Sequence, residues 1–373
     1  MTGLVAPASE RAARLLLSRV AEPYDEKVKA LVAEHGVVDL VGYVVRDGRT
    51  PEGDRLDRFR PRLQSAQGVD EAQICRALGA RVLVPGDEEW PSRLDDLEHP
   101  PWCLWVRGPQ HLAEVTARSV AMVGSRASSA YGDEVTARIA YGLVERGFTT
   151  VSGAAYGIDA AAHRATLRAD GLTVAVLAGG VDVPYPRANT DLLVAIGGTG
   201  AVVSETPPGG APARMRFLSR NRIIAALTPG TVVVEANLRS GARSTTREAR
   251  ELDRHVMAVP GPVTSTMSAG CHEEIRLGAT LVTDAAEVAD LVGRIGEDIA
   301  PVKRGEVRPE DALEPETRRV WQWLRPRRSS SVDELMVRSG LGLSEVLVAL
   351  SELEQLGLAE HLLDGWKRAG GRR

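Results

Sequence analysis

The chain has 373 residues, and its 46 Lys and Arg stand against 50 Asp and Glu. The resulting net charge of −4 excludes a globally basic surface, so any nucleic acid would be bound by a local cluster. Three cysteines without zinc spacing disfavour a disulfide framework and a structural zinc site. The start of the chain does not resemble a signal peptide, and no apolar run is long enough to span a membrane. We therefore expect a cytoplasmic protein of two to three domains.

Residues 1–80 predict a small helical N-terminal domain. Apolar residues at helical spacing indicate helices over 11–17, 24–35 and 56–78, and Gly36 is placed to end the second of them. Arginines between residues 46 and 62 alternate with Asp and Glu, which is typical of a solvated face. We expect a packing or interaction domain, with contact to a DNA backbone as the alternative.

Residues 81–293 predict an α/β domain with a Rossmann-like, doubly wound, mostly parallel sheet. Near-continuous apolar segments such as 173–177 and 231–235 indicate strands that are buried on both faces. Further strands are expected at 120–123, 149–152, 201–204, 256–259 and 280–282, with strand-like segments at 82–84 and 103–106 adding an edge. The helices are expected to begin near Asp133, Ile158, Asn189, Arg216, Thr245, Cys271 and Ala285.

Six loops rich in Gly, Ser, Pro and Arg follow the predicted strands, at the sheet edge where such folds bind ligands. The first, Gly124-Ser125-Arg126, directs backbone N–H groups and a helix N-terminus toward a bound anion. It is not GxGxxG, and no GxxxxGK[ST] occurs, which disfavours a dinucleotide site and excludes a P-loop nucleotidase. Turn geometry explains any one glycine loop, but six at one edge predict a binding site.

The strongest chemical signal is segment 214–222, RMRFLSRNR, which carries four arginines and one of the chain's three phenylalanines. The helix dipole disfavours cations at a helix start, so arginines concentrated there predict a bound anion. Guanidinium groups form paired hydrogen bonds with phosphates, and Phe217 can stack on a base. We predict that this segment faces the 124–126 loop across a groove for a phosphodiester chain. The alternative is a solvated helix start whose arginines pair with carboxylates.

Catalytic patterns are weaker. Asp159 and His163 lie four residues apart on a predicted helix, which fits an acid/base pair or, more simply, a helix cap and its partner. Cys271 lacks a His–Asp partner set and is interpreted as structural. We predict no catalytic residue, cofactor or metal site. The enzymatic alternative is a nucleotide-binding or nucleotide-hydrolysing protein that uses Asp159, Glu205 or Glu235, and a third possibility is a scaffold whose arginines serve partner proteins.

Residues 294–315 are charged and contain proline, and they predict a linker to a winged-helix-like domain at 316–373. Its helices are expected at 317–324, 332–338 and 344–356, followed by a strand-like end. The third helix contains three glutamates and no Lys or Arg, so DNA phosphates would repel it. We expect a protein-contact or packing role for this domain, although the basic tail from Trp366 onward can still contact a DNA backbone.

Seven blocks of this sequence resemble, in order, the DprA/Smf family of DNA-processing proteins. They are VAMVGSRASSAYG, VSGAAYGIDAAAH, TVAVLAGGVDVPYP, GAVVSETPPG, FLSRNRIIAAL, TVVVEANLRSGARSTTREA and HVMAVPG. The lead-in elements WPSRL and PPWCLWVRG and both flanking segments fit as well, so the resemblance covers nearly the whole chain. It implies a protein without enzymatic activity that binds and shields single-stranded DNA, forms a homodimer and loads a RecA-type recombinase during DNA uptake or repair.

The resemblance also implies which residues form the strand-binding pocket. These are Gly124, Ser125, Arg126, Ser152, Gly153, Arg214, Phe217, Arg220, Asn221 and Arg222. The chain departs from the family at 270–275, GCHEEI, where the family has a Gly-Thr-Asn-x-Leu-Ile pattern. The resemblance implies that the family's dimer and RecA surfaces lie in that neighbourhood.

Overall fold

The computed structural model describes residues 7, 9–46, 48–66, 68–303, 305 and 309–369. The chain divides into two compact units, with the division between Ala300 and Pro301, and each unit is described by itself. Among the described residues, no helix is both long enough and apolar enough to cross a membrane. The predicted domain boundaries at residues 80, 293 and 315 stay predictions.

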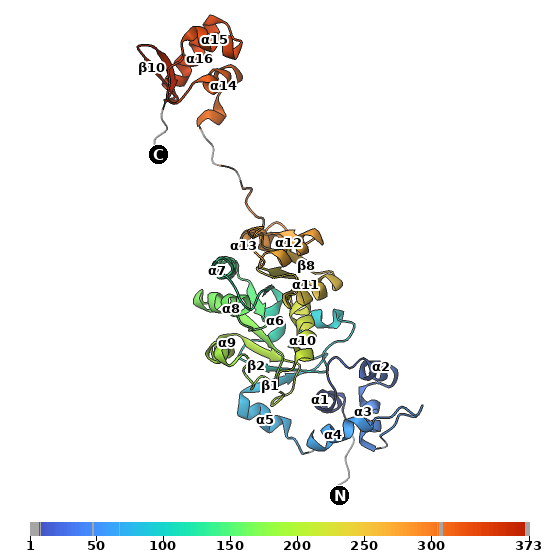
Figure 1. The fold of residues 1–373 in the computed structure, drawn as a ribbon. Helices are drawn as coiled ribbons and strands as arrows, with labels where there is room; N and C mark the ends of the chain where they lie inside the picture. Colours follow the sequence, from blue (N-terminus) through green and yellow to red (C-terminus); the bar gives the residue numbers. More distant parts are fainter. Residues whose placement is uncertain are drawn as a thin grey trace. The chain divides into compact units, whose positions relative to one another are not determined.

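A nine-stranded sheet forms the centre of the first unit (Figure 1). Its strand order is β1-β2-β6-β5-β4-β3-β7-β8-β9, and the pairs from β6 to β9 are all parallel. The strands are β1 (Ala80–Leu83), β2 (Leu104–Arg107), β3 (Ser119–Val123), β4 (Thr149–Ser152), β5 (Thr173–Leu177), β6 (Ala201–Ser204), β7 (Gly230–Val233), β8 (His255–Ala258) and β9 (Thr280–Leu281). The antiparallel strands β1 and β2 extend the sheet beyond β6. The predicted Rossmann-like, mostly parallel sheet and its added edge are confirmed.

Strand β3 is the topological switch point of this sheet. The chain proceeds from β3 through β4, β5 and β6 in one direction and then returns to pair β7 on the other side of β3. Val120 and Met122 pack into the core on one face, while Ala121 and Val123 pack into the core on the other. The loops after β3 and β7 therefore leave the sheet at the place where doubly wound folds bind ligands.

Helices cover both faces of the sheet. On one face lie α7 (Ala130–Glu145), α8 (Ile158–Arg168), α9 (Thr190–Thr199) and α13 (Ala285–Val292). On the other lie α6 (Leu112–Ala117), α10 (Arg214–Leu227), α11 (Ala242–Glu251) and α12 (Ala269–Arg276). Helix α7 begins three residues earlier than predicted because Ser129 caps it, accepting a hydrogen bond from the Gly132 N–H at 3.1 Å.

The N-terminal helices are α1 (Glu10–Val20), α2 (Glu26–His35), α3 (Val37–Arg46), α4 (Arg60–Ala66) and α5 (Glu71–Leu78). Gly36 ends α2 at a φ of 78°, as predicted, but α3 follows at once and was not expected. The predicted helix over 56–78 is interrupted, with a single 3-10 turn before α4. Helices α1 to α4 share a core that also buries Trp102 from the lead-in to the sheet, so they pack against the central domain, whereas Cys75 of α5 packs against a core cluster of the sheet.

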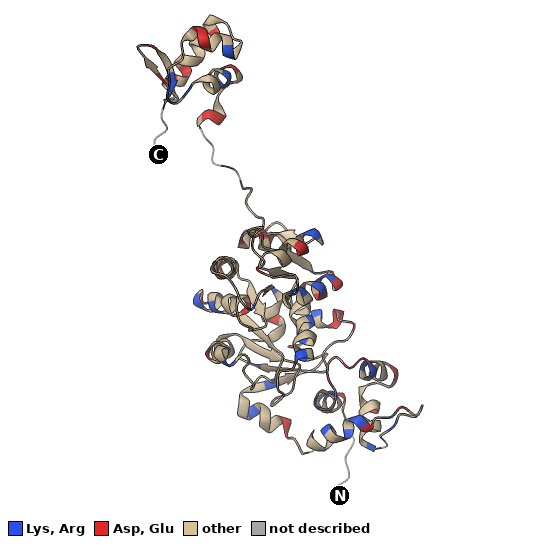
Figure 2. Cartoon of the chain, in the orientation of Figure 1, with Lys and Arg blue, Asp and Glu red and all other residues tan. Residues whose placement is uncertain are grey.

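The second unit contains α14 (Pro315–Trp323), α15 (Val332–Ser339), α16 (Leu343–Gln355) and the hairpin β10 (Ala359–Leu362) with β11 (Gly365–Arg368). Ser330 and Trp366 add a further bridge, which completes the predicted winged-helix arrangement. Leu313, predicted to lie in the linker, is buried in this core. Linker residues 304 and 306–308 lie outside the described residues. Acidic residues are prominent along α16 (Figure 2), and its predicted protein-contact role stays a prediction.

Candidate nucleic-acid interface

A cleft of about 770 Å³ lies beyond the carboxyl ends of β3, β4 and β7, at the switch point of the sheet. Its walls come from the loop after β3, the start of α8, the loop after β5, one face of α10 and the start of α11. Seven of the ten predicted site residues line it: Gly124, Ser125, Arg126, Arg214, Phe217, Arg220 and Asn221. The two segments that the sequence predicted to face each other do share one cleft.

The N-terminus of α7 is filled by a carboxylate of the chain itself. Glu235, two residues beyond β7, is buried and accepts hydrogen bonds from the Ser129 N–H at 2.9 Å and the Ser129 hydroxyl at 2.6 Å. A Cβ on Gly132 would lie 2.2 Å from the Glu235 Oε2, so glycine leaves the space that this carboxylate needs. The structure corrects the expectation that an external anion occupies this helix N-terminus.

The glycines of the first loop serve close packing. A Cβ on Gly124 would lie 2.5 Å from Ile158 and 2.9 Å from the carbonyl oxygen of Glu235. Gly157, at a φ of 73°, lies directly against the loop, where a Cβ would come within 2.1 Å of the Ser125 carbonyl oxygen. The Ser125 N–H donates to the Glu235 carbonyl at 2.6 Å, and the Ile158 N–H donates to the Ser125 carbonyl at 3.1 Å. This packing holds the loop that carries Arg126.

Arg126, Phe217 and Tyr185 form a cluster at the cleft, called here the stacking cluster. The guanidinium carbon of Arg126 lies 5.2 Å from the centre of the Phe217 ring. The Phe217 and Tyr185 ring centres are 5.5 Å apart with their planes inclined at 59°, and Tyr185 is 45% exposed. Two rings and a guanidinium in contact offer stacking faces for nucleobases. Sequence reasoning missed Tyr185, although it lies in the VPYP element of the third family block.

The four arginines of α10 separate into two kinds. Arg216 pairs with Glu22 through two hydrogen bonds of 3.0 and 2.9 Å, and Arg222 pairs with Glu205 at 2.7 and 2.8 Å. Neither arginine lines the cleft. Arg216 and Arg222 therefore follow the alternative prediction, in which the arginines of this segment pair with carboxylates. Arg214 is exposed at the cleft, and neither Arg214 nor Arg126 makes an ion pair with a carboxylate of the described residues.

Arg220, the remaining arginine of α10, forms the floor of the cleft. It is only 6% exposed, and its Nη1 donates to the Val176 carbonyl at 3.2 Å. Burial lowers the pKa of Arg220 to about 10, while the charge of Asp159 opposes that shift. The pKa of the Asp159 carboxyl is raised, chiefly by its own burial. Beneath the cleft, the negative charge of Asp159 therefore balances the positive charge of Arg220. Arg126 and Arg214, in contrast, are exposed.

Ser152 and Gly153 support this floor from outside the cleft lining. The Ser152 hydroxyl is buried and donates to the Met122 carbonyl at 2.6 Å, which ties β4 to β3. The Gly153 N–H donates to Asp159 at 3.2 Å, and a Cβ on Gly153 would lie 1.4 Å from the Arg220 Nη1. Asn221 lines the cleft, and its amide donates to the Gly241 carbonyl at 3.4 Å.

The groups considered for catalysis are engaged elsewhere. The His163 Nδ1 lies 2.7 Å from the Thr173 hydroxyl, and burial lowers the pKa of His163 to about 3. Asp159 instead accepts from the backbone of its own loop, so the two do not form the acid/base pair considered from the sequence. Glu205 is held by Arg222. Burial raises the pKa of the Cys271 thiol to about 12, as its structural interpretation requires.

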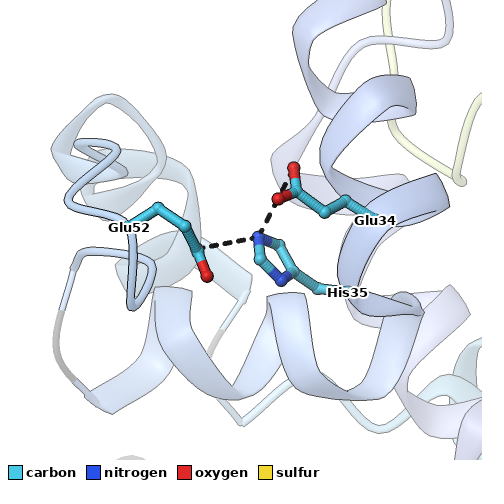
Figure 3. Close-up of side chains that lie close together, drawn as sticks. All are labelled: Glu34, His35 and Glu52. Atoms are coloured by element: carbon cyan, nitrogen blue, oxygen red, sulfur yellow. Dashed lines mark ion pairs between the residues drawn. The ribbon is translucent and has the colours of Figure 1, made fainter.

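One group with metal-ligand chemistry was not anticipated. Glu34, His35 and Glu52 belong to the N-terminal helical region, and one potential ligand atom from each lies within 4.8 Å of the others (Figure 3). Their sequence spacing matches no common metal motif, so only the folded chain brings them together.

Two known protein families match this chain. The family described as "DNA recombination-mediator protein A" matches residues 81–293, which span the sheet and every residue of the cleft. A second family, "DprA winged helix domain", matches residues 304–365. The chain belongs to the DprA/Smf family.

Individual relatives support membership of this family. The chain is 45% identical over 371 residues to a Mycobacterium tuberculosis protein provisionally named DNA processing protein DprA, covering 95% of this chain and 94% of the relative. It is 40% identical over 210 residues to protein Smf of Escherichia coli, covering 56% of each chain.

Two solved structures share the fold. The structure of DNA processing protein A from Streptococcus pneumoniae superposes with a TM-score of 0.63 at 31% identity, covering 77% of this chain and 99% of that one. The Helicobacter pylori protein, whose structure concerns its binding mode for single-stranded DNA, gives a TM-score of 0.51 at 26% identity. That match covers 57% of this chain and 94% of the other.

Proposed function

We propose that this member of the DprA/Smf family binds single-stranded DNA in the cleft at the switch point. The observation that carries the proposal is the arrangement of Arg126 and Arg214, which have no carboxylate partner among the described residues, beside the neighbouring rings of Phe217 and Tyr185. Arginines without partners attract phosphates, and exposed rings stack on bases. Single-stranded DNA offers both chemical groups at once.

The same geometry argues against two other ligands. A duplex keeps its base faces stacked inside, so the stacking cluster would have nothing to contact. A free nucleotide in a Rossmann-like sheet places its phosphate at the first helix N-terminus, and Glu235 already fills that position in α7. The Helicobacter pylori relative, whose structure concerns single-stranded DNA, supports the same choice of ligand.

We propose a binding role and no hydrolytic one. Asp159, Glu205 and Glu235 each have hydrogen-bond partners within the fold, which leaves none of them placed as a free general base. Incubation with nucleoside monophosphates tests this directly. Turnover that disappears in Asp159→Asn would favour the nucleotide-hydrolysing alternative.

We further propose that the chain acts in the cytoplasm as a homodimer, protects exposed or incoming single strands and loads a RecA-type recombinase on them. The family description as a recombination mediator supports this role. Whether the strands come from DNA uptake or from repair is a property of the host, and the proposed cleft serves both.

Recombinase assembly on strands coated with a single-strand-binding protein tests the whole proposal. We expect the wild-type chain to shorten the lag of RecA filament formation and Arg126→Ala to lose this effect. Arg216→Ala is the control, because it also removes one arginine but Arg216 lies on α10 outside the cleft, and Glu22 keeps Arg62 as a partner at 2.8 Å. A wild-type chain that binds the strand but leaves the lag unchanged would overturn the loading role alone.

A further inference from the structure

Glu34, His35 and Glu52 form a compact group of nitrogen and oxygen donors that does not line the DNA cleft. Glu34 and His35 are the last two residues of α2, and Glu52 lies in the loop between α3 and the turn before α4. The His35 Nε2 lies 3.3 Å from a carboxylate oxygen of Glu52 and 3.9 Å from one of Glu34. Figure 3 shows the two carboxylates on either side of this ring nitrogen.

The imidazole is fixed with a buried nitrogen directed into the group. The His35 side chain is only 9% exposed, and its Nε2 is inaccessible to solvent and has no hydrogen-bond partner among the described residues. The ring meets the edge of Tyr43, with 5.5 Å between the ring centres and 88° between the planes. A buried polar nitrogen without a hydrogen bond is costly, and a bound ligand would satisfy it.

The loop that carries the third donor is also held in place before any cation binds. Glu52 projects from a short hairpin in which the Leu56 N–H donates to the Gly48 carbonyl at 2.8 Å and the Thr50 N–H to the Asp54 carbonyl at 3.0 Å. Lys27 pairs with Asp54 at 2.8 Å, which ties the hairpin to α2. The group is therefore assembled by backbone hydrogen bonds and an ion pair outside it.

We propose that Glu34, His35 and Glu52 bind a divalent transition-metal cation, for which Zn²⁺ is the probe. One imidazole and two carboxylates suit Zn²⁺ or Mn²⁺, whereas Mg²⁺ and Ca²⁺ prefer oxygen donors alone. Ligands at about 2.1 Å from a tetrahedral Zn²⁺ are roughly 3.4 Å apart. The His35 Nε2 lies 3.3 Å and 3.9 Å from the two carboxylates, and the three donor atoms all lie within 4.8 Å of one another. Water completes the coordination, and the cation connects the end of α2 to the hairpin.

Titration calorimetry of the chelator-treated full chain with ZnCl₂ tests the site. We expect one tight equivalent in the wild type and a loss of affinity of about tenfold or more in His35→Ala and in Glu52→Gln. His99→Ala is the control, because His99 also lies near two carboxylates, 3.6 Å from Glu26 and 3.8 Å from Glu98, but belongs to no three-donor group. Its affinity should equal that of the wild type.

Glu52→Gln keeps the test independent of folding, since this side chain is 53% exposed and the hairpin is held by its backbone. Zn²⁺ should raise the thermal unfolding midpoint of the wild type and of His99→Ala, but not of Glu52→Gln. Equal Zn²⁺ affinity in the wild type and Glu52→Gln would overturn the proposal, as would a wild type that takes up no Zn²⁺.

Discussion

Phe217 lies between Tyr185 and Arg126, so its ring is the centre of the proposed stacking cluster. Phe217→Ala should weaken the binding of oligo-dT by about 1–3 kcal/mol for each base stacked on it. Fluorescence anisotropy measures this loss. Met215→Ala is the control, because Met215 is 44% exposed on the same helix but does not line the cleft. Equal losses in both variants would remove Phe217 from the account.

The sequence identified Arg126, Arg214 and Phe217 because arginine and aromatic residues in glycine-rich loops and at a helix start have few other uses. It also predicts Arg222 at this site, although Arg222 does not line the cleft. The partner of Arg216 is Glu22, 194 positions away, and the partner of Arg222 is Glu205, which follows a different strand. Charge pairing across such separations depends on the folded chain and leaves no local pattern.

At the scale of elements, the contact of the β4–α8 loop with α10 depends on the missing side chain of Gly153. Gly153→Ala would push the Arg220 guanidinium away from Val176 and Asp159, because the new Cβ would lie 1.4 Å from its Nη1. We expect a loss of roughly 1–3 kcal/mol in the free energy of unfolding, measured by urea denaturation, together with weaker DNA binding.

Gly198→Ala is the control for this substitution. Gly198 lies in α9, and a Cβ there would meet no atom within 4 Å. Its replacement should be neutral or stabilise the chain by about 0.5–1 kcal/mol. A Gly153→Ala chain as stable as Gly198→Ala would show that Arg220 is free to move and is not a fixed floor of the cleft.

Elements and their order were the most predictable part of the fold. Apolar runs buried on both faces indicated the parallel strands, and the connections between them indicated the helices. Boundaries were less predictable, since Ser129 starts α7 early and the helix predicted over 56–78 is interrupted. The role of Glu235 at the start of α7 was not visible, because it requires the loop after β7 to lie beside the loop after β3.

At the scale of the whole molecule, the buried His163 makes stability depend on pH. Its native pKa of about 3 lies below the ordinary value of 6.5, so between these values the unfolded chain binds a proton that the native chain does not. This contribution to stability is complete above 6.5 and declines as the pH falls toward 3. The slope from one such group is at most about 1.4 kcal/mol per pH unit.

His163→Asn removes this pH-dependent contribution to stability together with the contact to Thr173. The variant should be less stable than the wild type at pH about 7.5, and the difference should shrink as the pH is lowered to about 5. Urea denaturation followed by circular dichroism at several pH values measures the difference. A constant difference over this range would mean that His163 takes up its proton in the folded chain.

The central claim is that Arg126 and Arg214 hold the phosphates of a single DNA strand, and the salt dependence of oligo-dT binding tests it most directly. Each phosphate contact contributes about 0.7 to the slope of log K against log salt for single strands. We predict that Arg126→Ala and Arg214→Ala each bind more weakly with a slope shallower by about 0.7, while Arg216→Ala keeps the wild-type slope. Wild-type slopes in the first two variants, or an equal decrease in Arg216→Ala, would contradict the account.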